Sequence, residues 1–206
     1  MIRRLALILA AVATSAALFP AARAQDADPA ATARSLCDAL MASMKRGPAL
    51  DFAGRRDLLA PEVERDLNLP LMTRIVVGPS WRSLSPSDQK QLVEAFSACS
   101  VATYAQRFKS YAGERFEVDP VPAKLPSGDC IVHTRLFTGD PDPVQLDYLM
   151  RAGDGRWRII DVYLSGTISE LAARRSEYSA VLRQGGAPAL VDLLRKKAAD
   201  LGSQPG

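Results

Sequence analysis

The sequence predicts an α+β fold, in which a four-stranded antiparallel meander is covered by several helices. Three observations support this prediction. Apolar residues recur at helical spacing before Glu114, their spacing becomes two from Glu114 to Leu164, and helical spacing returns after Ser165-Gly166. Strands and helices that are segregated along a chain in this way are typical of helices packed on an antiparallel sheet.

The first 24 residues have the pattern of a secretory signal peptide. Arg3 and Arg4 precede a short apolar stretch, Leu5 to Phe19, and Ala22-Arg23-Ala24 follows as a cleavage site. Because the apolar stretch is short for a bilayer, a retained membrane anchor is the less favoured alternative.

Cleavage near Ala24-Gln25 leaves residues 25–206, which we expect to form one domain with mobile ends at 25–31 and 202–206. Without the signal peptide, Lys plus Arg falls from 26 to 23 and equals Asp plus Glu, so the domain is formally neutral. This neutrality removes the main sequence argument for nucleic-acid binding. No later apolar run reaches the length of a membrane span, so we expect a soluble, secreted domain.

Prolines divide the N-terminal helical region into several pieces. We expect one helix from about Pro29 to Lys45, a second from Phe52 to Leu59, and further pieces at Glu62–Leu67 and Pro70–Val77. The second helix is expected to stop before Pro61, because an internal proline removes a backbone hydrogen bond and clashes with the preceding turn.

Ser85-Pro86-Ser87-Asp88 has the features of a helix N-terminus: a capping serine, proline at the first helical position and an acid in the first turn. We expect the longest helix to run from here to about Tyr111. Its apolar rows contain Leu92, Phe96, Tyr104 and Phe108.

Four strands are expected after this helix: one around Phe116 and Val118, then Ile131–Thr138, Val144–Arg151 and Arg156–Leu164. Turns rich in Gly, Asp and Pro separate the last three, which predicts antiparallel hairpins. The fourth strand is apolar on both faces, so we expect it to be central and covered on both sides.

Two further helices are expected after the sheet. Helical spacing continues from Ile168 to Leu182, and Gly185-Gly186 ends it, because glycine pairs terminate helices. A final helix restarts near Pro188, with a leucine-rich stripe.

The domain contains three cysteines, Cys37, Cys99 and Cys130, an odd number for a secreted chain. They lack the C-x-x-C spacing of zinc and redox motifs. Two interpretations stay open: a disulfide between Cys99 on the long helix and Cys130 at a strand start, or three buried thiols that behave as small apolar residues.

Residues for catalysis are scarce. His133 is the only histidine, so a catalytic triad or a zinc site would depend on it. The chain has no phosphate-binding glycine loop and no nucleophile-elbow motif. Asp161 lies within an apolar strand, where a carboxylate needs a partner, and we interpret it as structural. We therefore expect no enzyme activity, no metal and no cofactor; a hydrolase or isomerase using Asp161 and His133 is a less favoured alternative.

Two stretches carry a family pattern. GRWRIIDVYLSG followed by RSEYSAVL resembles a W-R-[IV]-x-D-V strand, a glycine and a helix, and VVGPSWRSLSPSDQKQLVEAFSACSVATYAQRF resembles a G-x-x-W-x-x-L-[ST]-P stretch with its long helix. Both patterns are those of the MlaC (toluene-tolerance) family of periplasmic lipid-binding proteins, and together they cover most of residues 70–195. TISELAARRSEY and GGAPAL are most similar to the hopanoid-associated HpnM branch.

The resemblance implies an apolar lipid pocket between a curved sheet and the helices. It also implies a periplasmic carrier that shuttles a phospholipid or hopanoid between an inner-membrane ABC transporter complex and an outer-membrane lipoprotein complex. Moving an acyl chain of roughly 16 carbons into water costs about 12 kcal/mol, so unassisted transfer across the periplasm is slow. A ligand-free adaptor of a membrane transport complex is the alternative.

Candidate lipid-binding residues are apolar or aromatic positions on the predicted helices and strands: Val76, Phe96, Tyr104, Phe108, Leu146, Tyr148, Met150, Ile160, Val162, Leu164, Tyr178 and Leu182. Arg175 is the candidate for contact with a lipid head group or with a partner protein.

Overall fold

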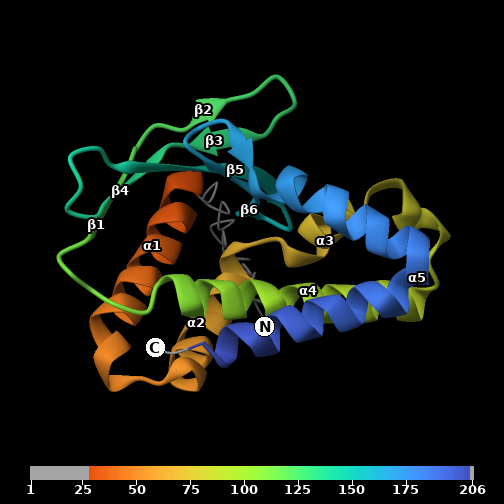
Figure 1. Cartoon of the computed structure of the whole chain (residues 1–206). Coiled ribbons are helices and arrows are strands. Elements are labelled where there is room, and N and C mark those ends of the chain that lie inside the picture. Colours follow the sequence, from red (N-terminus) through yellow and green to blue (C-terminus); the bar gives the residue numbers. More distant parts are fainter. Residues whose placement is uncertain (1–27, 205–206) are drawn as a thin grey trace, which may run out of the picture.

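A computed structural model of the chain describes residues 28–204, in which one antiparallel sheet packs on a layer of helices (Figure 1). This is the predicted α+β class. The predicted signal peptide, residues 1–24, and residues 25–27 of the predicted mobile N-terminal segment lie outside the described residues, as do residues 205–206 of the predicted mobile C-terminus.

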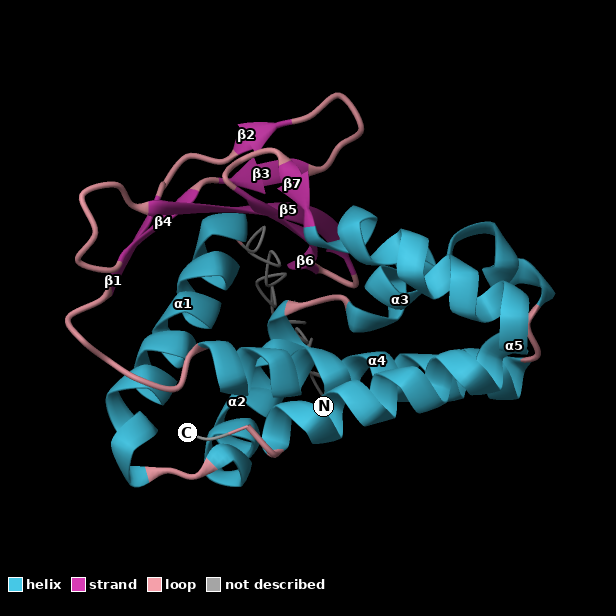
Figure 2. Cartoon of the chain, in the orientation of Figure 1, coloured by secondary structure: helices cyan, strands magenta, loops and turns pink. Residues whose placement is uncertain are grey.

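The structure contains five helices and seven strands among the described residues (Figure 2). The helices are α1 (Pro29–Arg46), α2 (Phe52–Asp66), α3 (Leu69–Val77), α4 (Pro86–Arg107) and α5 (Glu170–Gly202), with short 3-10 turns at η1 (Gly47–Ala49) and η2 (Gly78–Ser83). The strands are β1 (Arg115–Val118), β2 (Ala123–Lys124), β3 (Cys130–Val132), β4 (Thr134–Phe137), β5 (Val144–Gly153), β6 (Arg156–Leu164) and β7 (Ile168–Ser169).

Helix α1 begins where the sequence predicts. The Asp28 side chain accepts a hydrogen bond from the Ala30 amide at 3.0 Å and caps the helix ahead of Pro29. Part of the segment predicted to be mobile, residues 29–31, therefore forms the first turn of α1, with Ala30 fully buried. None of the described helices has the length and apolar character needed to cross a bilayer.

Helix α2 runs through Pro61, so the prediction of two separate helices on either side of this proline was wrong. Pro61 is exposed, whereas Leu59 and Val63 beside it are fully buried. Packing of this apolar face against α1 and α4 offsets the helix-breaking effect of an internal proline, which is about 3 kcal/mol.

Helix α4 begins at the predicted cap, where the Ser85 side chain accepts a hydrogen bond from the Asp88 amide at 3.1 Å. It ends at Arg107, short of the predicted Tyr111, because Phe108 leaves the helical conformation at φ −110° and ψ 55°. The Phe108 ring then packs near Tyr104 and Phe116, at centroid distances of 6.0 and 6.2 Å. This aromatic contact joins the end of α4 to the sheet.

The sheet has seven strands, not the predicted four. The predicted strand Ile131–Thr138 is broken at His133 into β3 and β4, which both pair with β5 on the same side. The break lets β3 pair with β2 while β4 pairs with β1. The two-residue strands β2 and β7 add further pairs at the margins, and the predicted hairpins β4–β5 and β5–β6 are antiparallel as expected.

The central strand is β5, and the prediction that Arg156–Leu164 is central was wrong. Strand β6 pairs along β5 on one side, but its other side meets only β7 and the segment between α2 and α3, where the Asn68 amide donates to Ile159 O at 2.8 Å. A register shift between Leu149 and Met150 leaves Ile160 as the extra residue of a bulge. Ile159 and Ile160 are nevertheless buried, which explains the apolar sequence of this strand.

Helix α5 is kinked at the predicted glycine pair. Gly186 has φ 67° and ψ −166°, a conformation that is essentially restricted to glycine. The first half of α5 leaves the sheet, and the second half turns back and lies along α4 (Figure 1). Gly202, which the sequence placed in a mobile end, is the last residue of this helix.

Cys37, Cys99 and Cys130 are all buried and free. The structure therefore contains no Cys99–Cys130 disulfide, and the alternative of three buried thiols describes the fold. Trp81 and Trp157 are partly buried and pack against the main hydrophobic core between the sheet and the helices.

Candidate functional site

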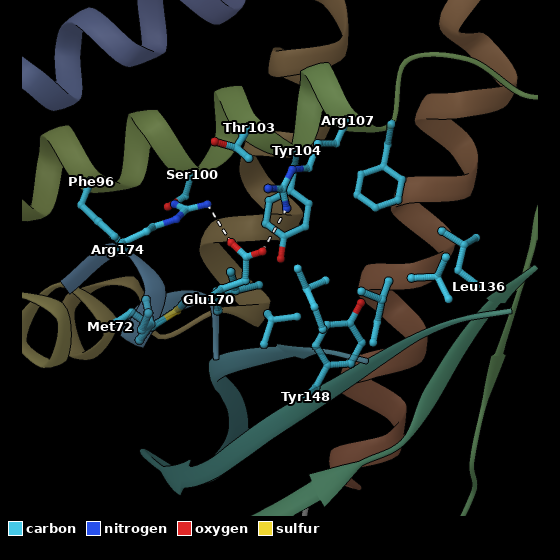
Figure 3. Close-up of a pocket in the computed structure, with 17 residues that line it drawn as sticks. Met72, Phe96, Ser100, Thr103, Tyr104, Arg107, Leu136, Tyr148, Glu170 and Arg174 are labelled. Carbon is cyan, nitrogen blue, oxygen red and sulfur yellow. Dashed lines mark hydrogen bonds and ion pairs between the residues drawn. The ribbon is translucent and has the colours of Figure 1, made fainter. Parts of the chain in front are cut away.

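An apolar cavity of about 260 Å³ lies between α4, the start of α5 and the helix-facing side of the sheet (Figure 3). Most of its lining is apolar or aromatic: Leu67, Met72, Phe96, Tyr104, Phe108, Leu136, Val144, Leu146, Tyr148, Val162, Leu164 and Leu171. The remaining lining residues are Ser100, Thr103, Arg107, Glu170 and Arg174.

The sheet side of the cavity follows from strand alternation. Val144, Leu146 and Tyr148 lie on the same face of β5, because alternate residues of a strand share a face. Across the sheet, Leu146 pairs with Leu164 and Tyr148 pairs with Val162. These cross-strand pairs form a continuous apolar wall.

The helix side of the cavity is formed mainly by α4. Phe96, Ser100, Thr103, Tyr104 and Arg107 follow the spacing of three and four residues that places side chains on one helix face. Ser100, Thr103 and Arg107 are the polar members, and Arg107 meets Glu170 where α4 approaches the start of α5 (Figure 3). The cavity therefore has an apolar body along the sheet and a charged region, the polar end, where α4 approaches the start of α5.

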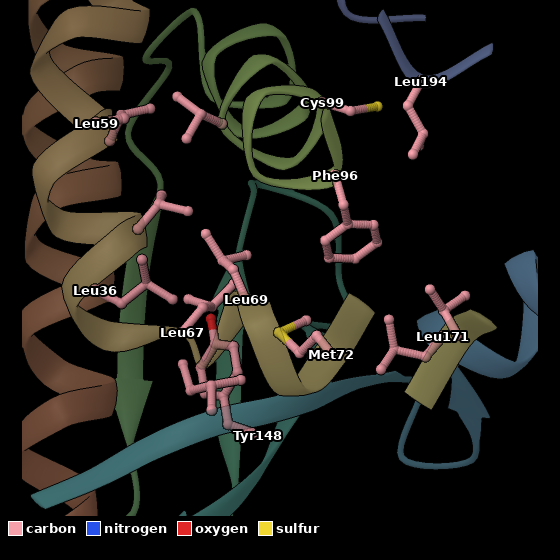
Figure 4. Close-up of a cluster of buried hydrophobic side chains, with 14 of the residues drawn as sticks. Leu36, Leu59, Leu67, Leu69, Met72, Phe96, Cys99, Tyr148, Leu171 and Leu194 are labelled. Carbon is pink, nitrogen blue, oxygen red and sulfur yellow. The ribbon is translucent and has the colours of Figure 1, made fainter. Parts of the chain in front are cut away.

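Several lining residues also belong to the buried core. Leu67, Met72, Phe96, Tyr148 and Leu171 are part of the main hydrophobic cluster (Figure 4). The cavity is thus a part of the interior that side chains leave unfilled, continuous with the packed region around α1, α2 and α3.

An ion-pair cluster occupies the polar end. Glu170, in the first turn of α5, lies between Arg107 and Arg174, with Oε1 3.5 Å from Arg107 Nη1 and Oε2 3.0 Å from Arg174 Nη2. The Arg107 side chain is 54% exposed, whereas those of Glu170 and Arg174 are 18% and 24% exposed. The cluster therefore spans from the solvent to the edge of the apolar lining.

The two tyrosines of the cavity remain neutral at ordinary pH. Burial raises the pKa of Tyr104 to about 12, and burial raises the pKa of Tyr148 well above its usual value. The Tyr148 hydroxyl lies 4.0 Å from Cys37 Sγ. Both hydroxyls are therefore polar groups without charge in an otherwise apolar surface.

Seven of the sequence-predicted candidates line this cavity: Phe96, Tyr104, Phe108, Leu146, Tyr148, Val162 and Leu164. The other five lie outside it, namely Val76, Met150, Ile160, Tyr178 and Leu182. The first four of these are buried in ordinary packing, and Leu182 is partly buried against the core.

Some lining residues were missed at the sequence level. Val144 belongs to the alternating pattern of β5, two residues before Leu146, so alternation alone could have found it. Ser100, Thr103 and Arg107 follow the helical row of Phe96, but they are polar and so were not counted with an apolar face. Leu67 and Met72 come from the region whose helices the sequence divided differently.

The structure places Arg174, and not the predicted Arg175, at the cavity. Consecutive helical residues point about 100° apart, so only one of the two arginines faces the site. A Cβ atom added at Gly78 would lie 2.9 Å from Arg175 Nη2, which shows that the Arg175 guanidinium rests over the turn after α3. A partner contact through the exposed Arg175 stays a prediction.

Asp161 has a structural environment. Its carboxylate accepts hydrogen bonds from Ser169 Oγ at 2.5 Å and from the amides of Val162 and Leu171 at 2.8 and 3.3 Å. It therefore fixes the start of α5, the segment that brings Glu170 to the cavity. A carboxylate in an apolar strand was expected to need a partner, and these hydrogen bonds provide partners for Asp161.

His133 does not contribute to the cavity between the sheet and the helices. Its Nδ1 lies 3.0 Å from Asp147 Oδ2, and it lines a separate hollow of about 270 Å³ that also contains Asp119 and Arg135. Within residues 28–204, no group of three His, Cys, Asp or Glu side chains is placed to hold a metal ion. The described residues that line the main cavity can contact a bound ligand. They include the hydroxyl groups of Ser100, Thr103, Tyr104 and Tyr148 but no histidine that could act as a base beside them.

Comparisons with known proteins agree with this architecture. The sequence model of the MlaC protein family matches residues 34–196. A phospholipid-binding protein from Ralstonia solanacearum, solved in complex with a phospholipid, is similar in structure, with a TM-score of 0.71 and 24% sequence identity. The similarity covers 86% of this chain and 100% of that chain. At this identity the structural likeness supports the fold.

Proposed function

The chain belongs to the MlaC family, and on this premise we propose that it is a non-enzymatic carrier that holds the apolar part of a membrane lipid between its sheet and its helices. The observation that carries the proposal is the division of the cavity into an apolar body and a polar end. A membrane lipid has the same division, so its tail and its head group each meet a matching surface.

The apolar body provides the free energy for such binding. Each CH₂ group transferred from water to an apolar surface contributes about 0.8 kcal/mol. The aliphatic and aromatic lining residues of β5, β6 and α4 provide that surface. The Ralstonia solanacearum protein, which shares the fold along its whole length, was solved with a phospholipid, and this supports a lipid as the ligand here.

The size of the cavity indicates that loading requires movement. About 260 Å³ lies just below the range of roughly 300–1,000 Å³ that is typical of small-molecule sites. A complete diacyl or polycyclic lipid therefore needs a wider space. The first half of α5 is the wall that we expect to move, because it ends at the kink at Gly186 and carries Glu170 and Arg174.

We further propose that the carrier works in the periplasm and transfers lipid between inner- and outer-membrane complexes. The predicted signal peptide supports export. A soluble carrier in this compartment would lower the barrier set by exposing an acyl chain to water, without making or breaking a bond. Both a phospholipid and a hopanoid have an apolar part suited to the cavity body.

Native mass spectrometry tests this function. The mature protein is purified from periplasm without detergent, its mass is measured intact, and the ligand is identified after organic extraction. We expect one lipid per chain. A clean ligand-free mass, together with no uptake from liposomes, would refute the carrier and favour a ligand-free adaptor of a membrane complex.

A transfer assay tests the shuttle separately. Lipid-loaded protein is incubated with acceptor liposomes, and the loss of lipid from the protein is followed with time. We expect transfer with the lipid chemically unchanged. Altered mass of the extracted lipid would indicate an enzyme and contradict the proposal.

A further inference from the structure

Arg107, Glu170 and Arg174 form the charged part of the cavity lining (Figure 3). Their arrangement indicates which kind of lipid head group the cavity would bind. We propose that the two arginines are an anion site for a lipid-borne phosphate, and that Glu170 occupies this site until the phosphate displaces it. The inference rests on the proposed lipid-carrier function and specifies the class of lipid.

The charge balance of the cluster supports an anionic ligand. The lining contains two arginines and a single carboxylate, so the polar end has one positive charge in excess. This excess lies beside an apolar wall, where charges are screened less than in bulk water. An anion that enters with an apolar tail would therefore be attracted to this end of the cavity.

The geometry shows that Glu170 uses only part of the arginine capacity. Each guanidinium has five N–H donors in a planar fork. Glu170 contacts a single nitrogen of each arginine, and the Arg107 contact is long, at 3.5 Å. A phosphate has more acceptor oxygens than a carboxylate and can accept paired hydrogen bonds from both forks.

The backbone at the start of α5 is not the source of this site. The Leu171 amide donates to Asp161 Oδ1, and the Ala172 amide donates to Ser169 Oγ. Those two N-terminal donors already have partners within the protein. The arginine side chains are therefore the groups that can exchange Glu170 for another anion.

Displacement is feasible because Glu170 can remain in place beside the site. It belongs to the first turn of α5, where a negative charge is favoured by the helix dipole even without the arginines. The half-exposed Arg107 side chain can rotate towards solvent or towards the cavity. The cluster can thus open without unfolding either helix.

This arrangement predicts selectivity for the head group. A lipid with a phosphate next to its tail gains charge-assisted hydrogen bonds at the polar end, whereas an uncharged polycyclic alcohol such as a hopanoid gains none of them. In the uncharged case the arginines keep Glu170 as their partner. The inferred cargo is therefore a phosphate-bearing lipid.

The test compares two probes with the same tail, dodecyl phosphate and dodecanol, by displacement of a neutral fluorescent apolar dye from delipidated protein. We expect the wild type to bind dodecyl phosphate roughly tenfold or more tightly than dodecanol. This preference should shrink as salt is raised, because part of it is electrostatic. The salt series needs no variant and so does not depend on mutant folding.

Variants show which side chains cause the preference for dodecyl phosphate over dodecanol. R107Q/R174Q should bind the two probes with equal affinity, while E170Q should strengthen dodecyl phosphate binding because the competing carboxylate is gone. R175Q is the matched control: it removes an arginine from the same helix that lies over Gly78, and it should retain the wild-type preference.

The outcomes separate this inference from the proposed function. If the wild type binds both probes with equal affinity, the anion site is refuted and the lipid carrier remains. If it binds neither probe, both proposals fall. Inorganic phosphate alone should give no arginine-dependent heat in calorimetry; such a heat would assign the site to a free anion and overturn the lipid assignment.

Discussion

Leu146→Asp is the sharpest perturbation of the cavity wall. Leu146 is 9% exposed, lies on the helix-facing side of β5 and pairs with Leu164. Aspartate at this position places a carboxylate in the apolar body, where an acyl chain would have to cover it. We expect lipid occupancy to be lost, because an ionised group without a partner in an apolar site is strongly unfavourable.

The same substitution lowers stability by a predictable amount. Loss of a buried leucine removes about 1.5–3 kcal/mol of burial, and the desolvated carboxylate adds to this loss. A total of about 3–4 kcal/mol lies below the 5–15 kcal/mol stability of a typical domain, so the variant should fold. For a domain of this size we expect the Tm to fall by about 10 °C.

Met150→Ala is the matched control. Met150 is fully buried on the same strand but lies outside the cavity, and its truncation should cost about 2–5 kcal/mol. Both variants are examined by circular dichroism, thermal unfolding and native mass spectrometry. The reasoning predicts lipid on the methionine variant and none on the aspartate variant. A folded Leu146→Asp protein with a full complement of lipid would refute the assignment of Leu146 to the site.

Three further predictions follow from the fold. Asp161→Ala removes the acceptor of three hydrogen bonds at the start of α5 and should destabilise the protein by about 2–4 kcal/mol, as measured by urea unfolding; an unchanged unfolding midpoint would show that this anchor is dispensable. Gly186→Ala forces a Cβ into a backbone conformation at φ 67° and should cost about 1–3 kcal/mol in the same assay. If Gly186→Ala leaves the free energy of unfolding unchanged, the kink in α5 is not held by the glycine conformation. The hydrogen bonds from Arg151 lower the pKa of Asp129, so the stability from this pair is present above the usual aspartate range and is lost as pH falls through the lowered pKa. Asp129→Asn should therefore weaken the fall in stability below about pH 4, and identical acid unfolding of variant and wild type would contradict that role.

The sequence predicted the elements whose signals are local. The Ser85 cap, the hairpin turns and the break at Gly185-Gly186 each depend on a few neighbouring residues, because capping groups, turns and positive φ act over that range. The alternation of β5 also predicted that Leu146 and Tyr148 share a face. These features explain why the α+β class could be predicted without coordinates.

The errors concern residues whose behaviour depends on distant contacts. Pro61 is accommodated within α2 because the face formed by Leu59 and Val63 packs on other helices. The apolar β6 was expected to be central, but its buried middle is covered by the segment at Asn68 as well as by β5. Apolar sequence predicts burial, and it does not specify which element provides the cover.

The candidate site shows the same limit. Met150 and Leu146 have the same apolar character and lie on the same strand, yet Met150 is packed core and Leu146 lines the cavity. Likewise, the sequence singled out Arg175 for contact with a head group or a partner, which stays a prediction, and it could not show that the helix rotation brings the neighbouring Arg174 to Glu170 at the cavity. Neighbouring residues cannot specify a cavity, because a cavity is space that residues from α4, α5 and the sheet all leave unfilled.

By itself, the sequence determined the α+β class, the family pattern and the faces of the strands, since periodicity and caps are properties of the chain over short distances. Only the tertiary structure decided which apolar residues surround empty volume and which charged residues meet at its end. The cluster of Arg107, Glu170 and Arg174 illustrates the reason: Arg107 lies 63 residues before Glu170 along the chain and becomes its neighbour only when α5 packs against α4.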